Sequence, residues 1–195
     1  MKIGIMGGTF DPVHLGHMVA AETARESMKL DEIWFLPVNV PPHKENTLGA
    51  TALQRFEMVN LSVAGHPCFQ VKDLELKLGG TSFTIDTVAV LHEQYSGHQF
   101  AWIIGADMIQ YLPHWHQIER LAGLITFIGL SRQGYSTDVS NLAASVRDRI
   151  SLVEMPRIEI SSTEIREKCR QGKSIRFLVS DPVRIYIEEQ GLYGP

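Results

Sequence analysis

The chain alternates short apolar runs with longer segments in which polar and apolar residues mix. Short apolar runs are typical of buried strands, and the longer segments are typical of helices. The runs predict strands over 2–6, 32–37, 69–74, 99–104, 124–130 and 150–154. The mixed segments predict helices over 15–29, 51–64, 84–95, 139–148, 161–171 and 181–190, with short helical turns after Asp107 and His116.

Strands that alternate with helices favour a parallel sheet covered on both faces. We therefore predict an α/β fold, a doubly wound parallel sheet with helices on both faces. At 195 residues the chain is expected to form a single domain, 1–195. Ligands of such sheets bind beyond the carboxyl ends of the strands. Loops that begin at Gly7, Pro37, Gly105 and Ser131 follow predicted strand ends and are expected to converge there.

The most informative stretch directly follows the first predicted strand. It reads Gly7-Gly8-Thr9-Phe10-Asp11-Pro12-Val13-His14-Leu15-Gly16-His17. The two glycines have no Cβ, so we expect the backbone to turn there and a phosphate to approach its N–H groups. A helix begins near Leu15, and its N-terminus favours an anion. His14 and His17 are three residues apart and therefore share one face of that helix.

Other phosphate and metal motifs fit this stretch less well. No Gly-Lys-Ser/Thr follows, as a Walker loop requires, and the Gly-x-Gly-x-x-Gly dinucleotide fingerprint is absent. A zinc site needs three or four ligands, and no second cluster of ligands accompanies His14 and His17. We predict no protein-held metal site.

Composition argues against several classes of partner and location. A net charge of −4 gives no general attraction to nucleic acid or to an anionic membrane surface. The longest uncharged run suited to a membrane, 121–131, is too short to span a bilayer, and no signal peptide is visible. Two cysteines, Cys68 and Cys169, are too few for a disulfide scaffold. These features predict a cytoplasmic protein with reduced thiols.

Two motifs together resemble a known group of enzymes. The first is the stretch around His14 and His17, and the second is Ile160-Ser161-Ser162-Thr163-Glu164-Ile165-Arg166. In this order they are similar to the signatures of the nucleotidyltransferase superfamily. Intervening segments resemble the bacterial nicotinate-nucleotide adenylyltransferase family: Pro41-Pro42-His43-Lys44, Gly80-Thr81-Ser82-Phe83-Thr84-Ile85-Asp86-Thr87, Gly105-Ala106-Asp107 and Leu112-Pro113-His114-Trp115-His116. The resemblance covers nearly the whole chain and implies a Rossmann-like architecture.

The resemblance implies transfer of the adenylyl group of ATP to nicotinate mononucleotide, with release of pyrophosphate, in NAD biosynthesis. It places His14, His17 and Arg166 in the catalytic role, with helices of 161–195 completing the ATP site. Ser161 with Glu164 also fits a helix cap, which is compatible with a phosphate cradle because both use free N–H groups. The expected ATP-binding residues are Gly7, Gly8, Thr9, Phe10, His14, His17, Gly105, Asp107, Arg132, Ser161, Ser162, Thr163 and Arg166.

The expected acceptor residues are His43, Lys44, Thr84, Trp115 and His116. By resemblance, Lys44 pairs with the phosphate of nicotinate mononucleotide and Thr84 meets the nicotinate carboxylate. Trp115 follows Pro113-His114, where a planar indole is suited to stack on the ring. His116 replaces an aromatic or basic residue common in relatives, so its backbone N–H is the expected contact.

Several alternatives stay open. A sister enzyme acting on phosphopantetheine or another acceptor shares the two signatures, and a non-catalytic nucleotide-sensing module is a candidate of another class. Mg²⁺ is expected to arrive with ATP, held mainly by phosphates and water. The sequence gives no oligomeric state, with a homodimer among the options, and does not decide between nicotinate and nicotinamide.

Overall fold

A six-stranded sheet organises the chain. The computed structural model describes residues 1–40, 49–132 and 138–194. The strands are β1 (Lys2–Gly8), β2 (Glu32–Pro37), β3 (Phe69–Val71), β4 (Gln99–Gly105), β5 (Thr126–Arg132) and β6 (Ile150–Met155), in the order β3-β2-β1-β4-β5-β6. β4 pairs in parallel with β1 and β5, and β5 with β6. This is the strand order of a doubly wound Rossmann-type sheet. The order in which the chain adds strands switches from one side of β1 to the other between β3 and β4. The predicted fold class is confirmed.

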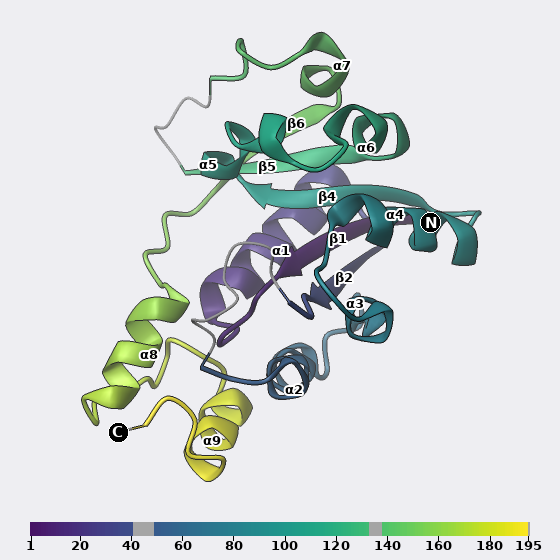
Figure 1. Cartoon of the computed structure of the whole chain (residues 1–195). Helices are drawn as coiled ribbons and strands as arrows, with labels where there is room; N and C mark the ends of the chain where they lie inside the picture. Colours follow the sequence, from purple (N-terminus) through teal and green to yellow (C-terminus); the bar gives the residue numbers. More distant parts are fainter. Residues whose placement is uncertain (41–48, 133–137, 195) are drawn as a thin grey trace. The chain divides into compact units, whose positions relative to one another are not determined.

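Helices connect the strands along the chain (Figure 1). They are α1 (Leu15–Met28), α2 (Ala52–Val63), α3 (Leu74–Leu78), α4 (Thr84–Gln94), α5 (Ala106–Ile109), the 3₁₀ turn η1 (Leu112–His114), α6 (Ile118–Leu124), α7 (Ala144–Arg147), α8 (Ser162–Arg170) and α9 (Asp181–Glu189). No helix among the described residues is long and apolar enough to cross a bilayer.

The chain folds into two compact units, each built from several segments. Unit 1 comprises 1–6, 20–34 and 83–157. Its core is apolar and tightly packed: a Cβ on Gly4 of β1 would lie 2.6 Å from Ile33 Cδ1 and 3.0 Å from Ile103 Cδ1. Only glycine fits such a position without displacing its neighbours. The expectation of one domain over 1–195 stays a prediction.

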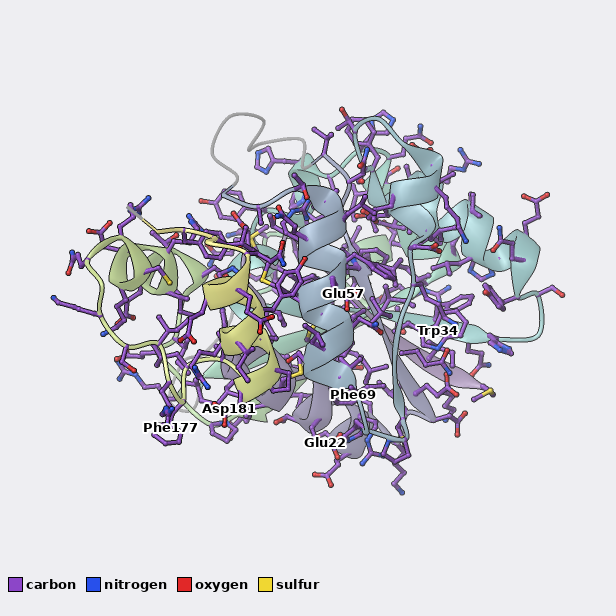
Figure 2. All side chains as sticks on the ribbon, turned by 90° about the horizontal axis from the view of Figure 1, so that it is seen from below. Glu22, Trp34, Glu57, Phe69, Phe177 and Asp181 are labelled. Atoms are coloured by element: carbon purple, nitrogen blue, oxygen red, sulfur yellow. The ribbon has the colours of Figure 1, made fainter. Side chains whose placement is uncertain are left out.

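Unit 2 comprises 7–19, 35–82 and 158–195. Within it α2 and α9 lie side by side in both views, with Glu57 on α2 and Asp181 at the start of α9 (Figures 1 and 2). Thr51 is the N-cap of α2, and its side chain and that of Gln54 form a reciprocal capping box. The two chain segments that carry the sequence motifs, 7–17 and 160–166, both belong to this unit.

Two segments outside the motifs fold differently from the sequence expectation. The predicted strand 69–74 ends at Val71, and α3 follows, supported by an ion pair of 2.9 Å between Lys77 and Asp73 one turn apart. The predicted helix 139–148 is reduced to α7, because the Asp138 carboxylate accepts from the Ser140 N–H and holds a turn instead.

The N-cap residue of α4 is Phe83, and no side chain makes a capping hydrogen bond there. The neighbouring Ser82 hydroxyl accepts a hydrogen bond from the Asn39 N–H, at 3.2 Å.

Candidate active site

The loop after β1 turns two residues later than expected. Gly7 and Gly8 belong to β1, and the chain turns at Phe10, whose φ is 50°. The prediction that the glycines make the turn is wrong. Gly8 has another role, because a Cβ there would lie 3.0 Å from Phe10 Cζ. Glycine at position 8 therefore lets the Phe10 ring fold back under the loop, where it is buried.

The two motif histidines come together, as the sequence predicts. The rings of His14 and His17 stack with centroids 3.7 Å apart and planes inclined by 27°. The His14 backbone N–H donates to His17 Nδ1 at 3.2 Å, which assigns the proton of a neutral His17 to Nε2. Phe10 also packs against the His17 ring, with centroids 5.0 Å apart and planes inclined by 76°. His17 thus presents a single, oriented N–H donor.

Both imidazoles are held neutral. Burial lowers the pKa of His14 to about 4. Burial, with a smaller contribution from His14, lowers the pKa of His17 well below its ordinary value. Of the buried side-chain atoms in the described residues, His14 Nδ1 is one without a hydrogen-bond partner. An unsatisfied polar atom of this kind is costly and is expected where a ligand supplies the missing bond.

The first turn of α1 leaves little space beside His14. A Cβ on Gly16 would lie 3.0 Å from His14 Nδ1 and 3.6 Å from Ile158 Cγ2. The glycine between the two histidines therefore has a steric role that the motif alone did not reveal.

The second motif meets the first within unit 2. Arg166 Nη1 donates to the Asp11 carbonyl at 2.7 Å, and the Ser162 hydroxyl donates to the Pro12 carbonyl at 2.9 Å. The peptide bond between Asp11 and Pro12 is cis. Ser161 caps α8, because its hydroxyl accepts from the Glu164 N–H. The structure thus brings Ser162 and Arg166 of the second motif to the loop that follows β1. Ser161 and Thr163 lie beside them, at the start of α8. The ATP-binding role of these four residues stays a prediction.

The expected acceptor residues that the structure describes lie in unit 1. Thr84 is the first residue of α4. The neighbouring Phe83 packs against His116, with ring centroids 5.0 Å apart. Trp115 is half-buried and meets Phe127 of β5 edge to face. The start of α4 and the segment around Trp115 and His116 are therefore neighbours, as the predicted acceptor site requires.

Other expected contacts are placed only in part. Gly105 ends β4 and caps α5, at a strand end as predicted. Asp107 lies in α5 and Arg132 ends β5, but their side chains are outside the described part of the structure. His43 and Lys44 lie outside the described residues altogether.

Sequence reasoning missed the buried polar residues beneath the loop. Arg55 of α2 is fully buried and donates to the carbonyls of Thr9 and Asn39 at 2.7 and 2.9 Å. Asp11 and Tyr193 are also buried and bonded to each other. The sequence does hint at Asp11, since an acidic residue in a loop expected to bind phosphate requires a partner. Nothing in the sequence marks Arg55 as buried, because it lies in an ordinary helical pattern.

Comparisons with known proteins place the chain. It matches the cytidylyltransferase-like family model over residues 5–168. It is 47% identical to the probable nicotinate-nucleotide adenylyltransferase of Oceanobacillus iheyensis, over 99% of this chain and 97% of the relative. It is 41% identical to the nicotinate-nucleotide adenylyltransferase of Bacillus subtilis, over 98% of both. The chain belongs to the nicotinate-nucleotide adenylyltransferase family.

A solved structure agrees on the fold of this family member. Plasmodium falciparum nicotinic acid mononucleotide adenylyltransferase complexed with NaAD superposes with a TM-score of 0.80. The match covers 98% of this chain and 97% of that one at 22% sequence identity.

Both cysteines of the chain are free thiols, as predicted.

The neutral state of His14 predicts acid sensitivity. The folded protein binds the His14 proton only near pH 4, whereas an unfolded chain binds it near 6.5. Stability is therefore fully present above 6.5 and is lost as the pH falls towards 4. His14→Asn is expected to remove about 2 kcal/mol of the fall in unfolding free energy between about pH 7 and pH 5.

Urea unfolding of both proteins at the two pH values measures this difference. His114→Asn is the matched control, since His114 is exposed. An equal fall in the wild type and in His14→Asn would contradict a neutral, buried His14.

Proposed function

We propose that this chain transfers the adenylyl group of ATP to nicotinate mononucleotide, forming nicotinate adenine dinucleotide and pyrophosphate in cytoplasmic NAD biosynthesis. Full-length relatives that carry the nicotinate-nucleotide adenylyltransferase name support it. The observation that carries the proposal is the stacked pair of His14 and His17 at the start of α1, with the Nε2–H of His17 free to donate.

The chemistry needs charge stabilisation more than a base. A phosphate monoester is largely ionised near neutral pH, since its second pKa is about 6. Its oxygen forms a bond to the α-phosphorus of ATP while the bond from that phosphorus to the bridging oxygen breaks. Pyrophosphate leaves with the electron pair. The enzyme has to bring the two anions into line and support the charge that develops on the oxygens.

His17 is suited to donate to an oxygen of the α-phosphate, and His14 to the α- or β-phosphate. Because both imidazoles are neutral in the free protein, no charge has to be buried before the ligand binds. A bound triphosphate then raises the pKa of both rings. The hydrogen bonds then strengthen as negative charge grows in the transition state. The N–H groups of Thr9 and Phe10 are suited to add further donors. In the first turn of α1, Gly16 can add its N–H, because the N–H groups of Leu15 and His17 donate to the Leu178 and His14 carbonyls.

The start of α8 supplies the second set of donors. Ser161 satisfies one N–H of the first turn, and the remaining free N–H groups favour an anion. The Arg166 side chain is 19% exposed, and it uses Nη1 for the Asp11 carbonyl. Nη2 makes a long hydrogen bond to the Thr163 hydroxyl, at 3.4 Å. The other N–H groups of the guanidinium are suited to bind the β- and γ-phosphates, as the motif predicts.

Mg²⁺ fits this donor set as a companion of the nucleotide. No three His, Cys, Asp or Glu side chains gather into a metal site within the described ranges. An ion held by the phosphates and water needs no such cluster. When bound, it would neutralise charge on the leaving pyrophosphate.

On the acceptor side, the N–H groups at the start of α4 around Thr84 suit the nicotinate carboxylate. The half-buried Trp115 suits stacking on the pyridine ring, with His116 and Lys44 as further contacts. A sister enzyme would keep the histidine pair but need a different acceptor, and a sensing module would bind ATP without turnover.

Pyrophosphate release from Mg-ATP is expected with nicotinate mononucleotide, and at least about tenfold less with nicotinamide mononucleotide or phosphopantetheine, because only the first offers a ring carboxylate to α4. His17→Ala is expected to lose about 100-fold or more in kcat with the fold intact, because a transition-state donor is gone. His114→Ala serves as the control. Pyrophosphate release only with another acceptor would contradict the assignment of the acceptor residues. Wild-type turnover in His17→Ala would contradict the catalytic role of His17.

Trp115→Ala is expected to raise the KM for nicotinate mononucleotide by about 5- to 10-fold, since stacking of an aromatic pair contributes about 1 kcal/mol. The KM for ATP should change by less. Steady-state kinetics with each substrate varied in turn measure both constants, and Trp102→Phe in β4 controls for loss of indole. Equal changes in the two constants would argue against stacking on the acceptor.

A further inference from the structure

Asp11 is a buried carboxylate with an unusually full set of partners. Its side chain is 3% exposed. Oδ2 accepts from the Gly49 N–H at 2.8 Å, and Oδ1 accepts from the Ala50 N–H at 3.1 Å and from the Tyr193 hydroxyl at 2.7 Å. These three donors satisfy a charge that would otherwise be costly to bury.

Tyr193 lies near the end of the chain, far from the loop in sequence. Burial and the neighbouring Asp11 raise the pKa of its hydroxyl, so the group keeps its proton and donates. The ring packs closely on Gly49, where a Cβ would lie 2.6 Å from Tyr193 Cδ1. The hydroxyl is thus held in one place by ring packing.

Arg166 competes for the same carboxylate. Its Nη1 is bonded to the Asp11 carbonyl at 2.7 Å, yet it stays 3.8 Å from Asp11 Oδ2. A close ion pair is shorter than about 3 Å. The three other donors to Asp11 therefore leave Arg166 beside the carboxylate without a close ion pair. Its Nη2 makes a long hydrogen bond to the neutral Thr163 hydroxyl, at 3.4 Å, so its positive charge can still act on a ligand.

We propose that Tyr193 is a positioning residue for ATP: its hydroxyl occupies the Asp11 carboxylate and so keeps Arg166 directed to the triphosphate. Without the hydroxyl, Oδ1 loses its shortest hydrogen bond. The carboxylate then draws the guanidinium into a closer ion pair, and Arg166 binds the phosphates less well. This inference rests on the proposed function only for the role of ATP as substrate.

The experiment is a double-mutant cycle on the full chain, with the Kd of Mg-ATP read by titration calorimetry. Tyr193→Phe keeps the ring and removes only the hydroxyl, and it is expected to weaken Mg-ATP binding about tenfold. In an Arg166→Ala background the same change is expected to alter the Kd by less than about twofold, because the competing guanidinium is absent. Tyr186→Phe, on the half-buried face of α9, is the matched control.

Thermal unfolding of each variant sets a temperature at which all are folded, so that binding is compared between folded proteins. An unchanged Kd in Tyr193→Phe would overturn the proposal. An equal loss in both backgrounds would also overturn it, because a merely structural role of Tyr193 weakens binding whether or not Arg166 is present.

Steady-state kinetics on the same variants add a second readout. A raised KM for ATP with a nearly unchanged KM for nicotinate mononucleotide is expected, and equal rises in both would count against the proposal. If the wild type bound Mg-ATP but showed no turnover, the proposed function would fail while the binding cycle still decided the role of Tyr193.

Discussion

The candidate site of unit 2 depends on the hydrogen bonds of Asp11. Its carboxylate joins the loop after β1 to Gly49 and Ala50, just before α2, and to Tyr193 near the C-terminus. Its backbone carbonyl accepts a hydrogen bond from Arg166 of α8. Removing one partner of a buried charge costs far more than the net value of the contact, because the charge is left unsatisfied. The arrangement therefore holds segments that are remote in sequence together at the loop after β1.

The same loop keeps two imidazoles uncharged in a site that we propose binds an anionic substrate. Packing of Phe10 and stacking of His14 on His17 bury the two imidazoles and keep them uncharged. A fixed positive charge there would destabilise the fold, whereas in the proposed mechanism a neutral donor gains charge only when a triphosphate binds. In that mechanism the stronger, charge-assisted hydrogen bonds form only after the ligand is bound. Arg166 supplies a fixed positive charge beside the loop.

Sequence patterns anticipated the elements and the motif residues better than their supports. Alternating apolar runs predicted the parallel sheet, and His-x-x-His spacing predicted the paired rings, because both follow from local periodicity. The turn at Phe10 and the buried Arg55 depend on packing between segments distant in the chain. No local pattern encodes such packing. The sequence did not predict the short lengths of α3 and α7. The ion pair of Asp73 with Lys77 supports α3, and the bond from the Ser140 N–H to Asp138 holds a turn before α7.

The most direct test is ¹⁵N NMR of the histidine side chains at neutral pH, with and without a non-hydrolysable Mg-ATP analogue. We expect His14 and His17 of the free protein to be neutral, with His17 protonated on Nε2 alone. Addition of the analogue is expected to shift both rings towards the charged form. Rings already charged in the free protein, or His17 protonated on Nδ1, would contradict a neutral histidine pair that gains charge on binding the triphosphate.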